Sequence, residues 1–330
     1  MTDSIAVLGA GSWGTALALL LSRNGYPVRL WGLAEEIKQL QLDHENKQFL
    51  PGYPFPENLL PEADLNRAIE GAAEILVAVP SHAFSKVLQT IEPHLADETT
   101  LSWATKGFEY TTQRLLSEVA SARLGERSLA VISGPSFAGE VAKGLPTAVT
   151  VAATTDDHAN RLAGYLHSET FRAYTTHDLI GVQVGGACKN ILAIAAGVSD
   201  GLGFGANTRS ALITRGLSEI MRLGKALGSQ SETFMGLAGM GDLVLTCTDN
   251  QSRNRRMGLA LAKGLSIAEA REEICQEVEG VQTTKEVYQL AQRLNVEMPI
   301  TAQVYRILFE GVSPEEAVNT LLHRKQKSEH

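Results

Sequence analysis

The 330-residue chain has few cysteines, no excess of basic residues and no long hydrophobic run. Its three cysteines, Cys188, Cys247 and Cys275, lack the paired spacings of a zinc site or a redox CxxC, so a reducing, cytoplasmic compartment is the simplest interpretation. A net charge of −8 argues against nucleic acid or an anionic membrane as a partner, because both are bound through broad basic surfaces. No basic segment precedes the first apolar stretch, which glycines interrupt and which is too short to cross a bilayer. We therefore expect no targeting segment and no integral membrane contact.

The length exceeds the size at which one hydrophobic core usually stops growing, so two domains are expected. Over residues 1–177, short apolar runs alternate with amphipathic segments, which is typical of βα units and a doubly wound, mostly parallel sheet. The expected strands are Ile5–Leu8, Val28–Trp31, Ile75–Val79, Thr100–Trp103, Leu129–Ile132 and Ala148–Val151. The expected crossover helices include Trp13–Arg23, Ala83–Ile91 and Thr112–Arg123.

Residues 178–330 have a different pattern, in which strand signals fade and long stretches rich in Ala, Leu and Gly follow. Apolar residues at helical spacing predict an all-helical second domain. Its expected helices are Leu179–Val198, Thr208–Leu227, Gln251–Ala262, Thr284–Leu294 and Ala302–Phe309. An α/β, Rossmann-type domain followed by a helical domain is thus the predicted fold.

A glycine-rich loop, GAGSWG, follows the first expected strand and opens the first expected helix. In such a loop Gly9 permits the tight turn, Gly11 lets the backbone approach a pyrophosphate, and Gly14 allows close packing of helix on strand. The helix N-terminus then offers free N–H groups to the phosphates. This context predicts a dinucleotide site, whereas an isolated glycine-rich turn can bind nothing.

The second expected strand ends in Leu30-Trp31-Gly32-Leu33-Ala34, without the acidic residue that usually binds the ribose hydroxyls of NAD. The first carboxylates, Glu35 and Glu36, come slightly late. A 2′-phosphate need not be repelled there. We therefore expect NADP or NAD to be accepted, with NADPH favoured.

Open α/β sheets bind ligands beyond the carboxyl ends of their strands, so residues that follow strands are candidate ligands. Lys106 is a single cation directly after one expected strand. Gly134 and Ser136 follow another in the sequence Gly-Pro-Ser, although this segment could equally be a plain turn.

One lysine, Lys189, lies in the small-residue stretch GGACKN within a predicted helix, with Asn190 as its only polar neighbour. A buried lysine can act as an acid or a base, although a lysine that extends from a buried helix to solvent is the plain alternative. Asp242 is a lone acid in an apolar stretch downstream and a possible partner for it. The run SRNRR then offers guanidinium groups for a phosphate, or it is an ordinary basic helix start.

Together these segments resemble the NAD(P)-dependent sn-glycerol-3-phosphate dehydrogenases of the bacterial biosynthetic type. The resemblance covers essentially the whole chain: GAGSWGTA, VPSHAF, WATKG, VISGPSFAGE, GGACKN, DGLGFGANT, GMGDLVLTCT and SRNRR stand in the family's order. It implies reduction of dihydroxyacetone phosphate to sn-glycerol 3-phosphate with NAD(P)H, feeding glycerophospholipid synthesis. The cofactor carries the hydride, so no metal is expected, and the histidines show no ligand spacing.

The resemblance also implies roles for individual residues. Lys189 is the proton-transferring group. Implied cofactor contacts are Gly9, Gly11, Ser12, Trp13, Gly14, Lys106, Ala138, Arg253, Glu277 and Glu279. Implied substrate contacts are Lys106, Gly134, Ser136, Lys189, Asn190, Asp242, Ser252, Arg253 and Asn254. Glu277 stands where related sequences can carry an apolar residue, so a side-chain role there is doubtful.

Two other interpretations stay open on the residues alone. One is a relative among the two-domain hydroxy-acid dehydrogenases, although SRNRR favours a phosphate over a second carboxylate. The other is a non-catalytic protein that senses NAD(P)H, which would not need Lys189, Asp242 and Arg253 together. A homodimer is the commonest oligomeric state and is the one expected.

Overall fold

The computed structural model describes residues 3–325. Its contacts divide the chain into two compact units that meet in the sequence at Gln183 and Val184, within helix α8 (Leu179–Gly201). The first unit is α/β and the second is helical, as predicted.

The first unit is built on an eight-stranded sheet with the order β10-β9-β8-β7-β6-β1-β2-β5. All neighbouring strands are parallel except β8 and β9. The strands are β1 (Ile5–Leu8), β2 (Val28–Trp31), β5 (Leu59–Glu62), β6 (Glu74–Val77), β7 (Thr100–Trp103), β8 (Leu129–Ser133), β9 (Thr147–Ala153) and β10 (Phe171–Thr176). Every residue of β1, β6 and β7 is buried, as expected for parallel strands covered on both faces.

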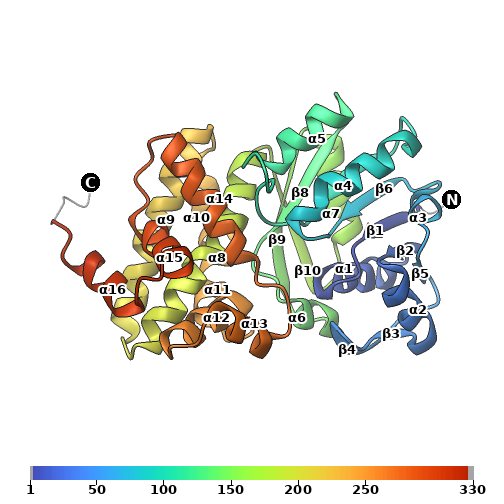
Figure 1. Ribbon diagram of the computed structural model, residues 1–330. Helices are drawn as coiled ribbons and strands as arrows, with labels where there is room; N and C mark the ends of the chain where they lie inside the picture. The colour runs from blue at the N-terminus through green and yellow to red at the C-terminus, as the bar shows by residue number, and fades with distance from the viewer. Residues whose placement is uncertain (1–2, 326–330) are drawn as a thin grey trace. The chain divides into compact units, whose positions relative to one another are not determined.

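Helices cover both faces of this sheet (Figure 1). Helix α1 packs on β1, β2 and α6, and α7 packs on β9 and β10, whereas α3, α4 and α5 follow one another on the other face. The helices are α1 (Ser12–Arg23), α2 (Ala34–Asp43), α3 (Leu65–Ile69), α4 (Ser81–Ile91), α5 (Leu116–Leu124), α6 (Ala138–Lys143) and α7 (Asp156–Leu166), with a 3₁₀ turn η1 (Glu92–His94) after α4. The amphipathic α4 buries Phe84, Val87, Leu88 and Ile91, which recur at helical spacing.

All six predicted strands are confirmed, but four further strands were not predicted. Edge strand β10 and edge strand β5 are half-exposed and lack a continuous apolar run. The small antiparallel pair β3 (Glu45–Asn46) and β4 (Leu50–Pro54) contains two prolines and a glycine, which are uncommon within strands. The predicted helix from Thr112 begins later, at Leu116, because residues 109–115 form a turn held by the Glu109 carboxylate.

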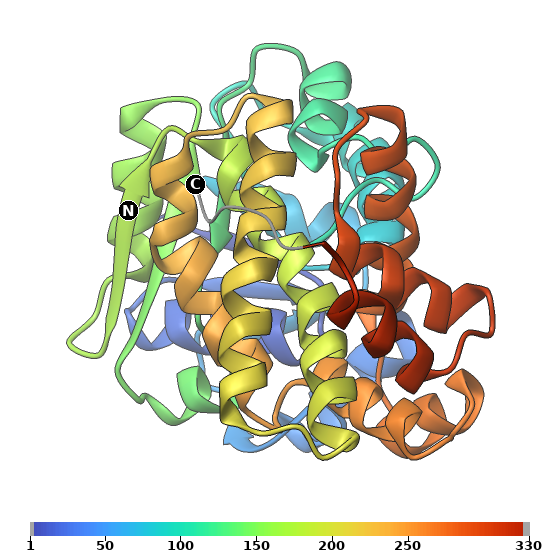
Figure 2. The same ribbon diagram turned by 90° about the vertical axis from the view of Figure 1, so that its left-hand side faces the viewer.

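The second unit contains helices α8 to α16 and a π-helical segment, η2 (Figure 2). After α8 these are α9 (Ala206–Leu227), α10 (Ser231–Met235), η2 (Leu237–Gly241), α11 (Asp242–Thr248), α12 (Arg253–Ala262), α13 (Ile267–Ile274), α14 (Glu279–Arg293), α15 (Pro299–Phe309) and α16 (Pro314–Leu322). The long helices α8 and α9 run side by side, and Gly216 of α9 leaves room for the Leu192 side chain of α8.

Glycines bring α8 and α12 into backbone contact. A Cβ at Gly258 would lie 2.7 Å from Val198 N and 2.9 Å from Gly197 Cα, and one at Gly197 would overlap the Arg255 carbonyl. Within residues 3–325, α8 is the helix whose length and apolar composition could span a membrane, but 89% of its most apolar stretch is buried inside the protein. The glycines of GGACKN and its continuation thus belong to a core helix of the second unit.

Candidate functional site

The glycine-rich loop joins β1 to α1 in a geometry that excludes a side chain at Gly9 and at Gly14. Gly9 has φ +127°, and a Cβ there would lie 2.7 Å from the carbonyl group of Ala78, which follows the neighbouring strand β6. A Cβ at Gly14 would overlap the Gly9 carbonyl oxygen. The loop backbone therefore packs directly against the end of β6, whereas a Cβ at Gly11 would meet no atom within 4 Å, so a ligand can approach the backbone at Gly11.

The N-terminus of α1 supplies the donors that a pyrophosphate needs. Its N-cap is Gly11, and no side chain caps the helix there. The first turn carries no acidic residue, so the partial positive charge of the helix end is not neutralised. Trp13 is half-buried and packs against the core, while Ser12 begins the helix. The loop thus fits the dinucleotide group for which its sequence is typical.

Two further predicted ligands follow adjacent parallel strands. Lys106 comes after β7 and Gly134 after β8, and these strands pair in register through Trp103 and Val131. Gly134 has φ +149°, and a Cβ there would lie 2.9 Å from Val149 Cα. The Ser136 hydroxyl donates to the Gly134 carbonyl at 2.9 Å. Because β1, β6, β7 and β8 are successive parallel neighbours, their carboxyl ends lie at the same end of the sheet. Lys106, Gly134 and Ser136 therefore lie at the end that carries the glycine-rich loop.

In the second unit, Lys189 of α8 forms an ion pair with Asp242, the first residue of α11. Their side chains are 10% and 1% exposed. Thr246, one turn along α11, donates to the Asp242 carbonyl at 2.6 Å and lies 3.4 Å from its Oδ1. The lysine is therefore a buried cation held by a buried carboxylate, not a lysine extended to solvent. The sequence indicated the pair, but it assigned no role to Thr246, although this residue lies in the segment GMGDLVLTCT.

The neighbouring Asn190 belongs to a chain of amide contacts. Asn254 Nδ2 donates to Asn190 Oδ1 at 2.9 Å, and Gly280 N donates to Asn254 Oδ1 at 2.9 Å. Asn190 Nδ2 is buried, and no protein partner for it is found in the part of the chain that the structure describes. A buried amide donor without a protein partner is available to a polar ligand. Asn254, by contrast, uses Nδ2 to bind Asn190 and Oδ1 to bind Gly280 at the start of α14.

The SRNRR run begins α12. Ser252 is the N-cap, and its hydroxyl accepts from Arg255 N at 3.2 Å. Arg255 is buried and donates to Asp200 Oδ2 at 2.5 Å and to Asn250 Oδ1 at 3.0 Å. Arg253 is half-buried, and within residues 3–325 no protein partner occupies its guanidinium. Of these two arginines, Arg253 is the one whose donors are available to an anion.

The last two predicted cofactor contacts lie at the start of α14. Glu279 is the first residue of that helix and is half-buried, whereas Glu277 is exposed.

The thiols of Cys188 and Cys247 are buried in the second unit. Burial raises the pKa of Cys247 to about 12, and it raises the pKa of Cys188 as well. Neither is therefore an activated nucleophile. Within residues 3–325, no group of three His, Cys, Asp or Glu side chains is placed to hold a metal ion.

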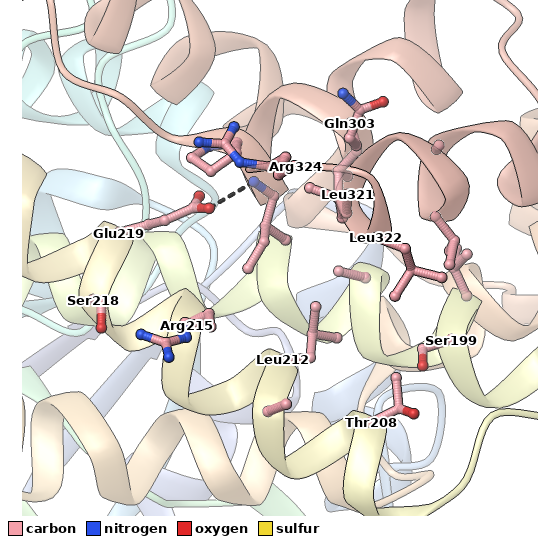
Figure 3. Close-up of a pocket in the computed structure, with 18 of the residues that line it drawn as sticks. Ser199, Thr208, Leu212, Arg215, Ser218, Glu219, Gln303, Leu321, Leu322 and Arg324 are labelled. Carbon is pink, nitrogen blue, oxygen red and sulfur yellow. Dashed lines mark hydrogen bonds between the residues drawn. The ribbon is translucent and has the colours of Figure 1, made fainter. Parts of the chain in front are cut away.

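A separate cavity of about 700 Å³ lies among α8, α9, α15 and α16 (Figure 3). Its walls are mainly apolar and include Leu212 and Leu321. Glu219 lines it and accepts from Ile300 N at 2.6 Å and Thr301 N at 3.2 Å, which caps α15. Burial raises the pKa of Glu219 to about 7, although these hydrogen bonds oppose the shift. None of the predicted site residues lines this cavity, so its size alone does not mark the reaction site.

Comparison with known proteins gives a consistent result for the whole chain. Residues 4–159 match the family model for the N-terminus of NAD-dependent glycerol-3-phosphate dehydrogenase, and residues 178–319 match the model for its C-terminus. The chain belongs to this family. The glycerol-3-phosphate dehydrogenases [NAD(P)+] of Pseudoalteromonas translucida and Aeromonas salmonicida are 56% and 55% identical to it, over 99% and 100% of both chains.

Solved structures of family members have the same fold. A crystal structure of glycerol-3-phosphate dehydrogenase from Coxiella burnetii has a TM-score of 0.96 at 51% identity and covers 98% of this chain and 99% of that one. The Saccharomyces cerevisiae enzyme has a TM-score of 0.84 at 26% identity, with 97% and 99% covered. Ketopantoate reductase from Ralstonia eutropha, at 15% identity and a TM-score of 0.58, shares the fold alone.

Proposed function

We propose that this chain reduces dihydroxyacetone phosphate to sn-glycerol 3-phosphate with NAD(P)H, reversibly, as the names of its close relatives imply. The observation that carries the proposal is the buried Lys189–Asp242 ion pair on α8 and α11. A carbonyl reduction needs a proton donor beside the carbonyl oxygen, and a buried ammonium held by a carboxylate is such a group.

The proposed mechanism assigns the proton to Lys189 Nζ. When bound, the nicotinamide supplies the hydride. As negative charge grows on the substrate oxygen, the Lys189 ammonium stabilises it and then delivers its proton. Asp242 keeps Lys189 charged and oriented, because an opposite charge nearby favours the ionised form. The unpartnered Nδ2 of Asn190, the residue next to this lysine, is available to donate to the substrate.

We assign the remaining predicted residues by unit, with residues 1–177 as the dinucleotide-binding domain and 178–330 as the substrate domain. In the first, Gly9, Gly11, Ser12, Trp13, Gly14 and Ala138 bind the cofactor, Lys106 binds cofactor and substrate, and Gly134 and Ser136 bind the substrate. In the second, the substrate phosphate is bound by Arg253 with the start of α12. The free guanidinium of Arg253 supports this role, since two parallel bonds to a phosphate need two available donors.

NADPH is the proposed preferred cofactor. Trp31 ends β2, and no carboxylate follows it directly. The Glu36 carboxylate accepts from Leu33 N at 3.4 Å as part of the capping of α2. A carboxylate used for capping is less available to bind ribose hydroxyls. We further propose a cytoplasmic homodimer whose product feeds glycerophospholipid synthesis.

The deciding experiment follows the oxidation of NADPH and of NADH by the loss of the absorbance of the reduced nicotinamide, with and without dihydroxyacetone phosphate. We expect oxidation that depends on the phosphorylated ketone, with 2-dehydropantoate as the control substrate. Oxidation with 2-dehydropantoate and none with dihydroxyacetone phosphate would contradict the proposed substrate. Binding of NADPH without turnover of either substrate would favour the sensor interpretation.

A further inference from the structure

Asn46, the second residue of β3, reaches the glycine-rich loop from a distant part of the sequence. Its side chain is buried, and Nδ2 donates to the Ala10 carbonyl at 2.8 Å and to Thr15 Oγ1 at 2.8 Å. Its Oδ1 accepts from Phe49 N at 3.0 Å. Ala10 is the second residue of GAGSWG, and Thr15 lies in the first turn and a half of α1.

The orientation of this amide is fixed by its partners. The Ala10 carbonyl can only accept a hydrogen bond and Phe49 N–H can only donate one, so a flipped amide would oppose like groups at both ends. Thr15 Oγ1 accepts from Asn46 and lies 3.4 Å from the Ala10 oxygen, which is a weak contact by comparison. Asn46 is therefore the main group that holds the Ala10 carbonyl.

Holding this carbonyl also fixes the next backbone donor. The bond between Ala10 and Gly11 is a planar trans peptide, in which C=O and N–H point in opposite directions. The Ala10 carbonyl points to the buried Asn46 amide, so the Gly11 N–H points away from the interior. Gly11 is exposed and is the N-cap of α1, where the donors for a pyrophosphate lie.

We propose that Asn46 is a positioning residue for cofactor binding, which orients the Ala10–Gly11 peptide so that its N–H meets the dinucleotide pyrophosphate. A glycine-rich loop is conformationally free, and the hydrogen bond from the buried Asn46 amide to the Ala10 carbonyl restricts this peptide before the ligand arrives. The second bond, to Thr15 Oγ1, anchors the same amide on α1. Asn46 then acts on the binding of NADPH, with no part in proton transfer.

Asn58 provides a matched control at the other end of α1. Its Nδ2 also donates to two carbonyl oxygens, those of Ser22 and Tyr26, both at 2.8 Å. It therefore donates the same number of side-chain hydrogen bonds as Asn46, at the C-terminal end of the same helix and away from the glycine-rich loop. Asn46→Ala and Asn58→Ala each remove two donated hydrogen bonds without adding charge, and Asn46→Ala also removes the bond from Phe49 N.

The test measures NADPH affinity by titration calorimetry, steady-state kinetics and urea unfolding for both variants. For Asn46→Ala we expect the Kd and KM for NADPH to rise roughly tenfold, the loss of about one to two hydrogen bonds, with the kcat at saturating NADPH and the KM for dihydroxyacetone phosphate nearly unchanged. Asn58→Ala should lower stability comparably and leave NADPH affinity unchanged. Equal effects of the two variants on NADPH affinity would overturn the proposal, because Asn46 would then act through stability alone.

Two probes locate the effect on the pyrophosphate. ADP contains this group and adenosine lacks it, so Asn46→Ala should weaken inhibition by ADP and leave inhibition by adenosine unchanged. If both weakened alike, the orientation of the Gly11 N–H would not be what Asn46 controls. Should Asn46→Ala fail to fold, Asn46→Ser keeps a donor of smaller reach, and undiminished ADP affinity in that folded variant would equally overturn the proposal.

Discussion

Arg255 Nη1 donates to Asp200 Oδ2 at 2.5 Å, and this ion pair joins α12 to α8 with side chains that are 9% and 11% exposed. Arg209 of α9 donates to the same oxygen at 2.7 Å. Two arginines around one carboxylate therefore connect three helices of the second unit. This gives Arg255 a structural role that Arg253, two residues earlier, does not share.

Arg255→Ala should destabilise the protein strongly. Removing one member of a buried ion pair leaves the Asp200 carboxylate with Arg209 alone, and broken buried pairs cost about 3–5 kcal/mol. Urea unfolding followed by circular dichroism measures the change. A loss of less than about 1 kcal/mol would show that Arg209 compensates fully.

Arg253→Ala should lower activity with little effect on stability. The guanidinium can bind a phosphate through two parallel bonds, so Arg253→Lys should also be harmful. We expect KM for dihydroxyacetone phosphate to rise and kcat to fall, because the phosphate also aligns the carbonyl. The measurement compares phosphorylated with unphosphorylated dihydroxyacetone in parent and variant. An undiminished preference for the phosphorylated compound would remove Arg253 from the phosphate site.

Lys189→Ala should lower turnover by roughly 10²-fold or more while NADPH affinity is kept, as expected for loss of a general acid. It also leaves the Asp242 carboxylate, which is 1% exposed, without its cation. The double variant Lys189→Ala/Asp242→Asn is the control, because it should recover stability without recovering turnover. Near-normal turnover in either variant would assign the proton to another donor.

NADPH should be used at least as well as NADH, since β2 ends without a carboxylate and Glu36 is engaged in capping α2. Rates at subsaturating concentrations of each cofactor decide the preference. A preference for NADH of more than about tenfold, or about 1.4 kcal/mol, would mean that another residue binds the ribose hydroxyls.

Glu219 should make stability depend on pH. Its pKa is raised to about 7 by burial, so the folded state binds its proton more tightly than the unfolded state does. Its favourable contribution is complete below the unfolded pKa, near 4.5, and is lost as pH rises through about 7. Urea unfolding across that range should show a declining free energy of unfolding in the parent. The decline should be smaller in Glu219→Gln, and equal declines would contradict the assignment.

The predictable part of the fold was the part with an unambiguous pattern. Strands β1, β2 and β7 match their predicted bounds because short buried runs end at polar or glycine residues. Strand β10 was missed because it lies at the sheet edge, where Arg172 and Thr175 are exposed and an apolar run is not required.

The site could be predicted where its residues are adjacent in the sequence and form a motif, as in GAGSWG or GGACKN. The sequence could not separate Arg253 from Arg255, although a helix turns about 100° per residue and places residues two apart on nearly opposite faces. Which face is buried depends on α8, through Asp200. Asn46 was missed because its partners are a carbonyl and a hydroxyl more than thirty positions away, which no local pattern encodes.

The glycine contact between α8 and α12 governs how these two helices can change. Gly197 and Gly258 lie where the two backbones meet, so even one added methyl group at either position would force the helices apart. This contact fixes the position of α8 along α12. It thereby also fixes the distance between Lys189 on α8 and Asn254 on α12.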